Sequence, residues 1–417
     1  MAEPVVETAT PVSAAPSTSL RGTGFWYLWI TAVSFALIAS ADRFTFIWLV
    51  EDTLGSPSWA TGVIVFSLGA PVCALVLTAG ALSDRLDRRR MLLTTQAAGL
   101  VVVCVGAVLV WTHVISLPLA VLLAVSFGTV SAFAMPVRSS LVPVLVGRER
   151  VMQAVVLMTI GANIAMIAGP LLVGGVIDAH GVGWAFAVQA LCFALGFASA
   201  VRIRVPPHPP VEHRRRLRAE IAEGIRFVWQ HDVLRSLFGL LCVGGGLMGG
   251  GAFTLLPQIA RDEFGRDASQ AARLFALMGL GMVTTSLWLM RNRSRLRRRG
   301  LVFMCFMVAG TTNQVFQGFA PTFLSLEILL LVWGLTGGFY MNLNQALIQE
   351  LTPPERMGRV MSLNSLVQAG LLPLGGLLAG LLATVIGAQH ALSVFGALGL
   401  ACVLLALGRA RGLRALP

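Results

Sequence analysis

Twelve predominantly apolar blocks, most of them about 20 residues long, constrain this chain more than any other feature of its sequence. A helix rises about 1.5 Å per residue, so about 20 apolar residues cross the roughly 30 Å hydrocarbon core of a bilayer. Only 12% of the 417 residues are charged and 56% are hydrophobic, which excludes a water-soluble enzyme. The sequence therefore predicts an all-α integral membrane protein with twelve transmembrane helices.

The apolar blocks form two sets of six on either side of the longest polar segment. The first set covers residues 25–50, 59–82, 91–111, 117–135, 151–177 and 182–200. The second set covers residues 237–259, 271–290, 301–319, 324–343, 360–386 and 391–407. A Glu-Arg pair precedes the fifth span of each half, at 149–150 and 355–356, which indicates a repeat of two pseudo-symmetric six-helix bundles.

This division predicts the organisation of the whole chain. We expect a disordered cytosolic tail over 1–22, an N-terminal bundle over 23–204, a cytosolic linker over 205–234, a C-terminal bundle over 235–410 and a cytosolic tail over 411–417. The first segment has no basic residue before Arg21, unlike a signal peptide. Within the linker, Leu217, Ile221, Ile225 and Val228 form one helical stripe, which predicts an amphipathic helix on the inner leaflet.

The basic residues indicate how the chain is oriented in the membrane. All 31 are Arg, and most lie in the segments that share one side of the predicted bundle. The opposite side holds only Arg261, Arg266 and Arg273, and Arg43 falls inside a span. Because positive charge is retained on the cytoplasmic side, both termini are expected in the cytoplasm. We interpret the net charge of +12 as this topology signal, and nucleic acid is not an expected partner.

Several kinds of chemistry are excluded by what the chain lacks. Without lysine it has neither the lysine of a phosphate-gripping P-loop nor that of a Schiff-base enzyme. The six Cys lie inside apolar blocks without metal-ligand spacing, so neither a disulfide framework nor a zinc site is indicated. We expect no metal, no cofactor and no enzymatic activity.

The segment 80–90, Gly-Ala-Leu-Ser-Asp-Arg-Leu-Asp-Arg-Arg-Arg, resembles the signature loop of the major facilitator superfamily between spans two and three. Asp87 stands where that family usually has Gly. The resemblance implies a conformational latch between the two bundles, formed by Gly80, Asp84, Arg85, Arg88 and Arg89. The alternative is that the arginines only anchor the topology.

Span five resembles the Gly-Pro signature of exporters in the same superfamily. Its Gly169, Pro170 and Gly174 are candidates for helix packing and bending, because small residues admit a neighbouring helix and proline frees a carbonyl. Generic packing, with no bearing on the direction of transport, is the alternative interpretation.

Further stretches, at 136–143, 344–351 and 359–363, resemble the subgroup that contains the enterobactin exporter and macrolide efflux proteins. The resemblance implies a secondary transporter that works by alternating access and exports small amphipathic compounds, such as drugs or macrolides, in exchange for protons. The mid-span-four Arg of proton-coupled drug exporters is replaced here by Ala124.

Charges inside a hydrocarbon core are costly, so each is a functional candidate. Asp42 in span one is the expected proton carrier, because a carboxyl group that changes partners during a conformational change takes up and releases a proton. A fixed ion pair or a charge at the outer mouth is the rival interpretation. Glu327 either holds a proton or faces the outer headgroups. Arg43 points about 100° away from Asp42 around the helix and is a candidate substrate or structural contact.

Amide side chains within the spans are candidates for lining a substrate cavity. They are Asn163, Asn313, Gln314, Asn342 and Gln345. Hydrogen bonding between helices explains such amides equally well.

We therefore expect a monomeric proton-coupled exporter in the inner membrane of a bacterium, in contact with membrane lipid and carrying a small amphipathic substrate. A siderophore exporter or importer of the same fold is one alternative. A non-transporting membrane receptor or scaffold is another, and it would tolerate replacement of Asp42.

Overall fold

The computed structural model describes residues 24–83, 87–204, 217–292, 296, 298–414 and 416, and their regular elements are helices. The N-terminal half contains α1 (Phe25–Trp48), continued by the π-helical η1 (Leu49–Thr53), then α2 (Ser58–Ser83), α3 (Arg88–Trp111), α4 (Leu117–Val146), α5 (Val151–His180) and α6 (Val182–Val201). The linker helix is α7 (Leu217–Gln230). The C-terminal half contains α8 (Asp232–Cys242), the π-helical η3 (Val243–Gly250), α9 (Gly251–Asp262), α10 (Ala268–Asn292), α11 (Arg299–Gln317), α12 (Phe323–Leu351), α13 (Met357–Ile386), α14 (Ala388–Arg409) and the short α15 (Arg411–Arg414).

Among the described residues, 11 helices are long and apolar enough to cross a membrane, with α8, η3 and α9 counted as one span. The remaining expected span is α11, whose amides Asn313, Gln314 and Gln317 lower its hydropathy. It packs against α12 and α14 and takes the place of the ninth span. The predicted all-α membrane fold, with six helices in each half, is confirmed.

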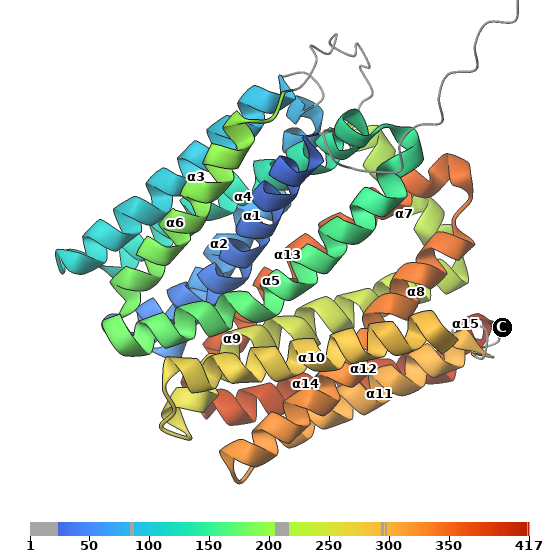
Figure 1. Ribbon diagram of the computed structural model, residues 1–417. Helices are drawn as coiled ribbons and strands as arrows, with labels where there is room; N and C mark the ends of the chain where they lie inside the picture. Colours follow the sequence, from blue (N-terminus) through green and yellow to red (C-terminus); the bar gives the residue numbers. More distant parts are fainter. Residues whose placement is uncertain are drawn as a thin grey trace, which may run out of the picture.

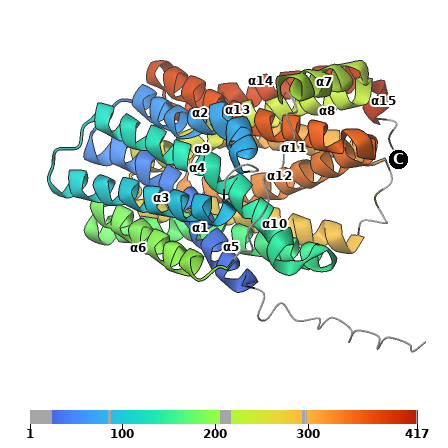
Figure 2. The ribbon, with the colours of Figure 1, turned by 90° about the horizontal axis from the view of Figure 1, so that it is seen from above.

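Figure 1 shows the start of α1 and the C-terminus toward one end of the bundle, which we call the terminal end. The opposite end carries the connections from α1 to α2 and from α9 to α10, and we call it the loop end. The two halves meet along two helix pairs, α2 with α13 and α5 with α10. Figure 2 shows α2 beside α13 from above.

Glycine lets α2 and α13 approach closely near the loop end. A Cβ atom on Gly380 would lie 2.7 Å from the Cα atom of Gly62, closer than real Cβ atoms come to other atoms. Any larger side chain at either position would force the two halves apart, because the contact on both sides is backbone.

Asp178 joins the halves between α5 and α10. Its Oδ1 accepts a hydrogen bond from the amide N of Ala268 at 2.8 Å, and its Oδ2 accepts one from Ser269 at 2.9 Å. Both donors lie in the first turn of α10, where backbone N–H groups have no partner inside the helix and the helix dipole favours an anion. Nearby, the side chain of Gln258 in α9 donates to Ser58 in α2.

Helix α4 is longer than the span predicted over 117–135. It continues through Pro136 and Pro143 to Val146, and Gly147 ends it with a φ of 73°. Proline disfavours a helix interior, but the additional turns bury Val137 and Leu141 in the core. Packing against the other helices therefore outweighs the local cost of the prolines.

Helix α7 covers the described part of the predicted linker, and residues 205–216 lie outside the described residues. It attaches to the C-terminal half, where Glu223 forms an ion pair with Arg359 and Arg356 lies 4.6 Å over the ring of Phe227. Trp229 on its other face is 68% exposed. This two-sided character is that of a helix between protein and membrane surface.

The cap at Asp178 makes a stability prediction. Asp178→Ala should lower the free energy of unfolding by about 1 kcal/mol, because two backbone donors of α10 lose their acceptor. The apparent melting temperature of the purified protein in detergent measures this effect. Asp52→Ala is the matched control, because its side chain is 53% exposed and lies 3.6 Å from Arg261. Equal melting temperatures for the two variants would contradict the prediction.

Candidate functional site

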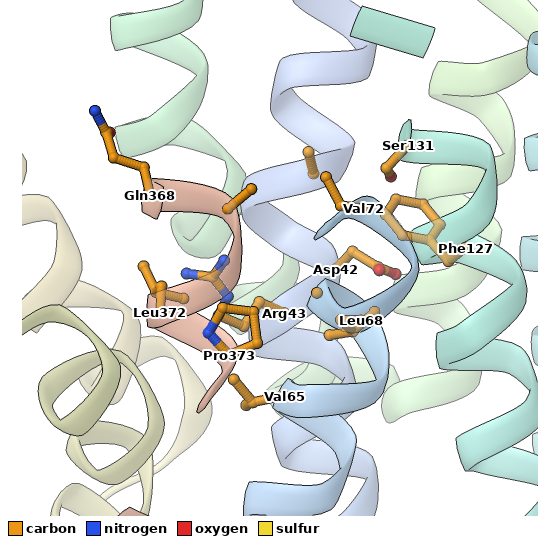
Figure 3. Close-up of a pocket in the computed structure, with 13 residues that line it drawn as sticks. Asp42, Arg43, Val65, Leu68, Val72, Phe127, Ser131, Gln368, Leu372 and Pro373 are labelled. Carbon is orange, nitrogen blue, oxygen red and sulfur yellow. The ribbon is translucent and has the colours of Figure 1, made fainter. Parts of the chain in front are cut away.

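A cavity of about 230 Å³ lies between the two halves, lined by α1, α2, α4 and α13 (Figure 3). The N-terminal half contributes Asp42 and Arg43 from α1 and Phe127 and Ser131 from α4, and the C-terminal half contributes Gln368 from α13. The rest of the lining is largely apolar. A cavity shared by two halves can change its access when the halves move relative to each other.

Asp42 is the buried acid of this cavity. Its side chain is 1% exposed, and neither carboxylate oxygen has a hydrogen-bond partner among the described residues. Figure 3 shows its carboxylate directed toward Phe127, while Arg43 points to the other side of α1, toward Leu372. The guanidinium carbon of Arg43 lies 5.4 Å from the ring centre of Phe253 in α9. The two adjacent charges therefore face different parts of the molecule.

Arg138 is a buried charge that lies beyond the end of the span predicted over 117–135. It lies in α4, is 8% exposed, and its Nε and Nη2 have no hydrogen-bond partner among the described residues. Its guanidinium carbon lies 3.8 Å from the ring centre of Phe35 in α1. A signal was present in the sequence, because the apolar Val137 and Leu141 continue the helical pattern past Pro136.

Glu327 lies on α12, outside the set of cavity-lining residues. Its Oε1 accepts a hydrogen bond from Nε of Arg273 in α10 at 3.1 Å, and a second guanidinium nitrogen completes the ion pair. Both helices belong to the C-terminal half. The contact therefore ties two helices of one half together, whereas Asp42 lies in the cavity wall without a partner among the described residues.

The predicted amides fall outside the cavity. Gln314 donates to the carbonyl of Leu247 at 3.1 Å, and Asn313 accepts from Gln317 at 2.8 Å. Asn342 donates to Ser286 of α10 at 2.9 Å. The bonds of Gln314 and Asn342 join different helical elements, whereas that of Asn313 lies within α11.

Two predicted amides have other surroundings. Gln345 accepts from Asn364 at 3.3 Å, and Asn163 is exposed on α5. Asn364 lies on α13, one turn from the cavity-lining Gln368. Of the candidate substrate contacts, the structure places Arg43 in the cavity wall.

The predicted latch is described only in part. Gly80 lies in α2 and Arg88 begins α3, whereas Asp84 and Arg85 lie outside the described residues. Arg89 donates to the carbonyls of Ile203 at 2.8 Å and Val201 at 2.9 Å. It therefore binds the C-terminal end of α6 within its own half, where a cation complements unpaired carbonyls.

The predicted packing residues of span five lie at helix contacts. A Cβ atom on Gly169 would clash with Ser40 of α1, and one on Gly174 would lie 2.9 Å from the carbonyl oxygen of Ala268 in α10. Pro170 is buried inside α5. Gly174 thus contacts the opposite half, beside the cap formed by Asp178.

In the described part of the chain, no group of three or more His, Cys, Asp or Glu side chains is placed to hold a metal ion. The six Cys are free thiols. The groups at the cavity can bind ions, accept hydrogen bonds and hold a proton, but they include no nucleophile positioned by a base.

Comparison with known proteins agrees with this architecture. The family model of the Major Facilitator Superfamily matches residues 28–372, with a second match over 294–415. The enterobactin exporter EntS of Escherichia coli O1:K1 is 23% identical over 306 residues, which are 73% of this chain and 72% of the relative. The EntS protein of Citrobacter koseri is 24% identical over the same shares.

Solved structures are similar in fold. The nucleoside transporter NupG has a TM-score of 0.72 at 13% identity, over 94% of this chain and 99% of that chain. A bacterial homologue of the human lysosomal transporter Spinster, described as inward-facing and unoccupied, has a TM-score of 0.65 at 14% identity, over 94% of this chain and 96% of its own. With the family model matched across most of its length, this chain belongs to the Major Facilitator Superfamily and is an integral membrane transporter rather than an enzyme.

Proposed function

We propose that this transporter exports small amphipathic compounds, such as drugs or macrolides, across the bacterial inner membrane in exchange for protons, with Asp42 as the proton carrier. The observation that carries the proposal is a buried carboxylate without a hydrogen-bond partner in a cavity between two halves. An ionised carboxylate in such a place is strongly disfavoured, whereas a protonated one is neutral. Asp42 then exchanges its proton with whichever side of the membrane the cavity is open to.

The energy available from one proton is sufficient for this task. A charge that crosses a membrane potential of 100 mV releases about 2.3 kcal/mol, and each 1.4 kcal/mol is a factor of ten in concentration. One proton per substrate therefore supports accumulation of about 50-fold.

The orientation of the cycle follows from the distribution of arginine. With the terminal end in the cytoplasm, the contacts of Gly62 with Gly380 and of Asp178 with α10 close the outer side of the cavity. Export requires these contacts to break and equivalent contacts to form at the cytoplasmic side. The same side also holds an apolar contact between the halves, where the ring of Phe44 in α1 meets that of Phe275 in α10 at 5.9 Å.

Export of a siderophore is the second candidate, because the relatives that are 23% and 24% identical are named enterobactin exporters. It uses the same cavity and the same proton site. The substrate alone distinguishes the two candidates.

Replacement of the proton carrier tests the proposal. In an efflux-deficient bacterial host, the native chain should lower the accumulation of ethidium, erythromycin or a siderophore, and an uncoupler should abolish the effect. Asp42→Asn should abolish it as well, because an amide cannot carry the proton. Glu327→Gln is the matched control and should keep uncoupler-sensitive export, since Glu327 lies away from the cavity wall.

Two results would count against Asp42. Uncoupler-sensitive export by Asp42→Asn, at equal protein levels, would move the proton site elsewhere. Loss of coupling in Glu327→Gln alone would assign the role to the ion pair with Arg273.

The gate at the loop end makes a separate prediction. Gly380→Leu should hold the outer side open, because its side chain meets the backbone of Gly62. A Ser58→Cys reporter should then react severalfold faster with a membrane-impermeant maleimide added from outside the cell. Gly175→Leu is the matched control, because a Cβ atom there meets no atom within 4 Å. Unchanged labelling in Gly380→Leu would show that this glycine pair is not a gate.

A further inference from the structure

Arg138 is a buried cation that the proposed proton cycle leaves unexplained. The described residues place no carboxylate within 4.0 Å of its guanidinium nitrogens, and two of those nitrogens have no hydrogen-bond partner. A buried charge persists in a membrane protein when a partner compensates it or when its function requires it. Arg138 therefore either performs a function that requires its charge or binds a partner that lies outside the described residues.

Arg138 shares a helix face with the cavity wall. Ser131 and Phe127 precede it on α4 by seven and eleven residues, which places each of them within about 20° of Arg138 around the helix axis. On α1, Phe35 precedes Asp42 by seven residues and likewise lies on the same face. The facing surfaces of α1 and α4 thus carry the cavity at one level and Arg138 with Phe35 about 10 Å nearer the terminal end.

An aromatic wall joins these two levels. The ring of Phe35 is stacked on Phe127 at 6.5 Å with an interplanar angle of 4°, and both rings meet the edge of Phe193 at 6.2 and 6.3 Å. Phe127 lines the cavity. The cation–π contact with Phe35 stabilises the guanidinium plane but leaves its N–H donors free for an acceptor.

The charged side chains around the cavity carry a net positive charge, which favours the binding of an anion. Two cations, Arg43 and Arg138, accompany a single acid, Asp42, so one positive charge is in excess when Asp42 is ionised and two when it is protonated. Arg43 already lies against Phe253 in the opposite half. A planar guanidinium with free donors binds a carboxylate or a similar oxyanion through two parallel hydrogen bonds.

We propose that Arg138 anchors a negatively charged group of the cargo, so that the transported compounds carry an acidic group on an aromatic or apolar body. The acidic group binds the guanidinium, and the body lies along Phe35 and Phe127 toward the cavity. This assignment rests on the proposed function of the cavity as the transport site. It narrows the substrate class to organic anions, so that among the probes of the export assay a siderophore with acidic groups fits it, and the cationic ethidium and erythromycin do not.

Equilibrium binding to the purified full-length protein tests this assignment. The probes are 2-naphthoate and 2-naphthalenemethanol, which share an aromatic body and differ in charge, and binding is measured by equilibrium dialysis in detergent. The native protein should bind the carboxylate at least tenfold more tightly than the alcohol. Arg138→Gln should lose that preference while its affinity for the alcohol stays within twofold, and Arg138→Lys should retain part of it.

Arg202→Gln is the matched control. Arg202 is an exposed arginine of the same half whose guanidinium carbon lies 5.9 Å from the ring of Tyr27, outside the cavity. Its replacement should leave the affinities for both probes unchanged. Equal melting temperatures of the variants establish that the fold is intact, and Arg138→Lys serves if Arg138→Gln is unstable.

Three outcomes would overturn the assignment. They are equal affinity of the native protein for the two probes, absence of naphthoate binding, and an unchanged preference in Arg138→Gln. Dialysis requires neither export nor proton coupling. If Asp42→Asn still binds naphthoate but fails to export, both proposals are supported. If export depends on Asp42 but Arg138→Gln keeps the preference for naphthoate over the alcohol, only the assignment of Arg138 is overturned.

Discussion

Buried charge is the constraint on which the functional interpretation of this structure depends. In a membrane interior, a charged side chain is retained when it has a partner or when its function requires it. Glu327 has such a partner in Arg273, within one half of the molecule. Asp42 and Arg138 have none among the described residues, and both lie on the facing surfaces of α1 and α4. The absence of a partner is what separates these two groups from the structural ion pair.

The contacts between the halves near the loop end are formed largely by backbone groups. Where α2 meets α13, glycine allows backbone to lie against backbone, and where α5 meets α10, a carboxylate caps the first turn of the opposite helix. Neither contact buries a large apolar side chain. A third contact at the loop end is apolar, because Phe44 of α1 meets Phe275 of α10 at 5.9 Å, so separation of the halves there would expose aromatic surface.

Much of the fold could be predicted from the sequence, because apolar length alone specifies a membrane helix. Asp42 and Arg43 could also be identified, since charges stand out inside an apolar block. Arg138 was missed, because the predicted span ended at residue 135 although Val137 and Leu141 continue the apolar pattern beyond it. The amides of α11 were equally ambiguous, since an amide that lines a cavity and one that joins two helices look alike in sequence.

The sequence by itself determined the membrane location, the division into two halves and the presence of an acid within the first span. These properties depend on hydrophobic length and on charge, which are local in the chain. Only the tertiary structure decided that Asp42 lines a cavity between the two halves, that Glu327 is paired, and that Arg138 is buried beside an aromatic wall. Those outcomes depend on which helix faces meet, and facing residues such as Phe35 and Arg138 are far apart along the chain.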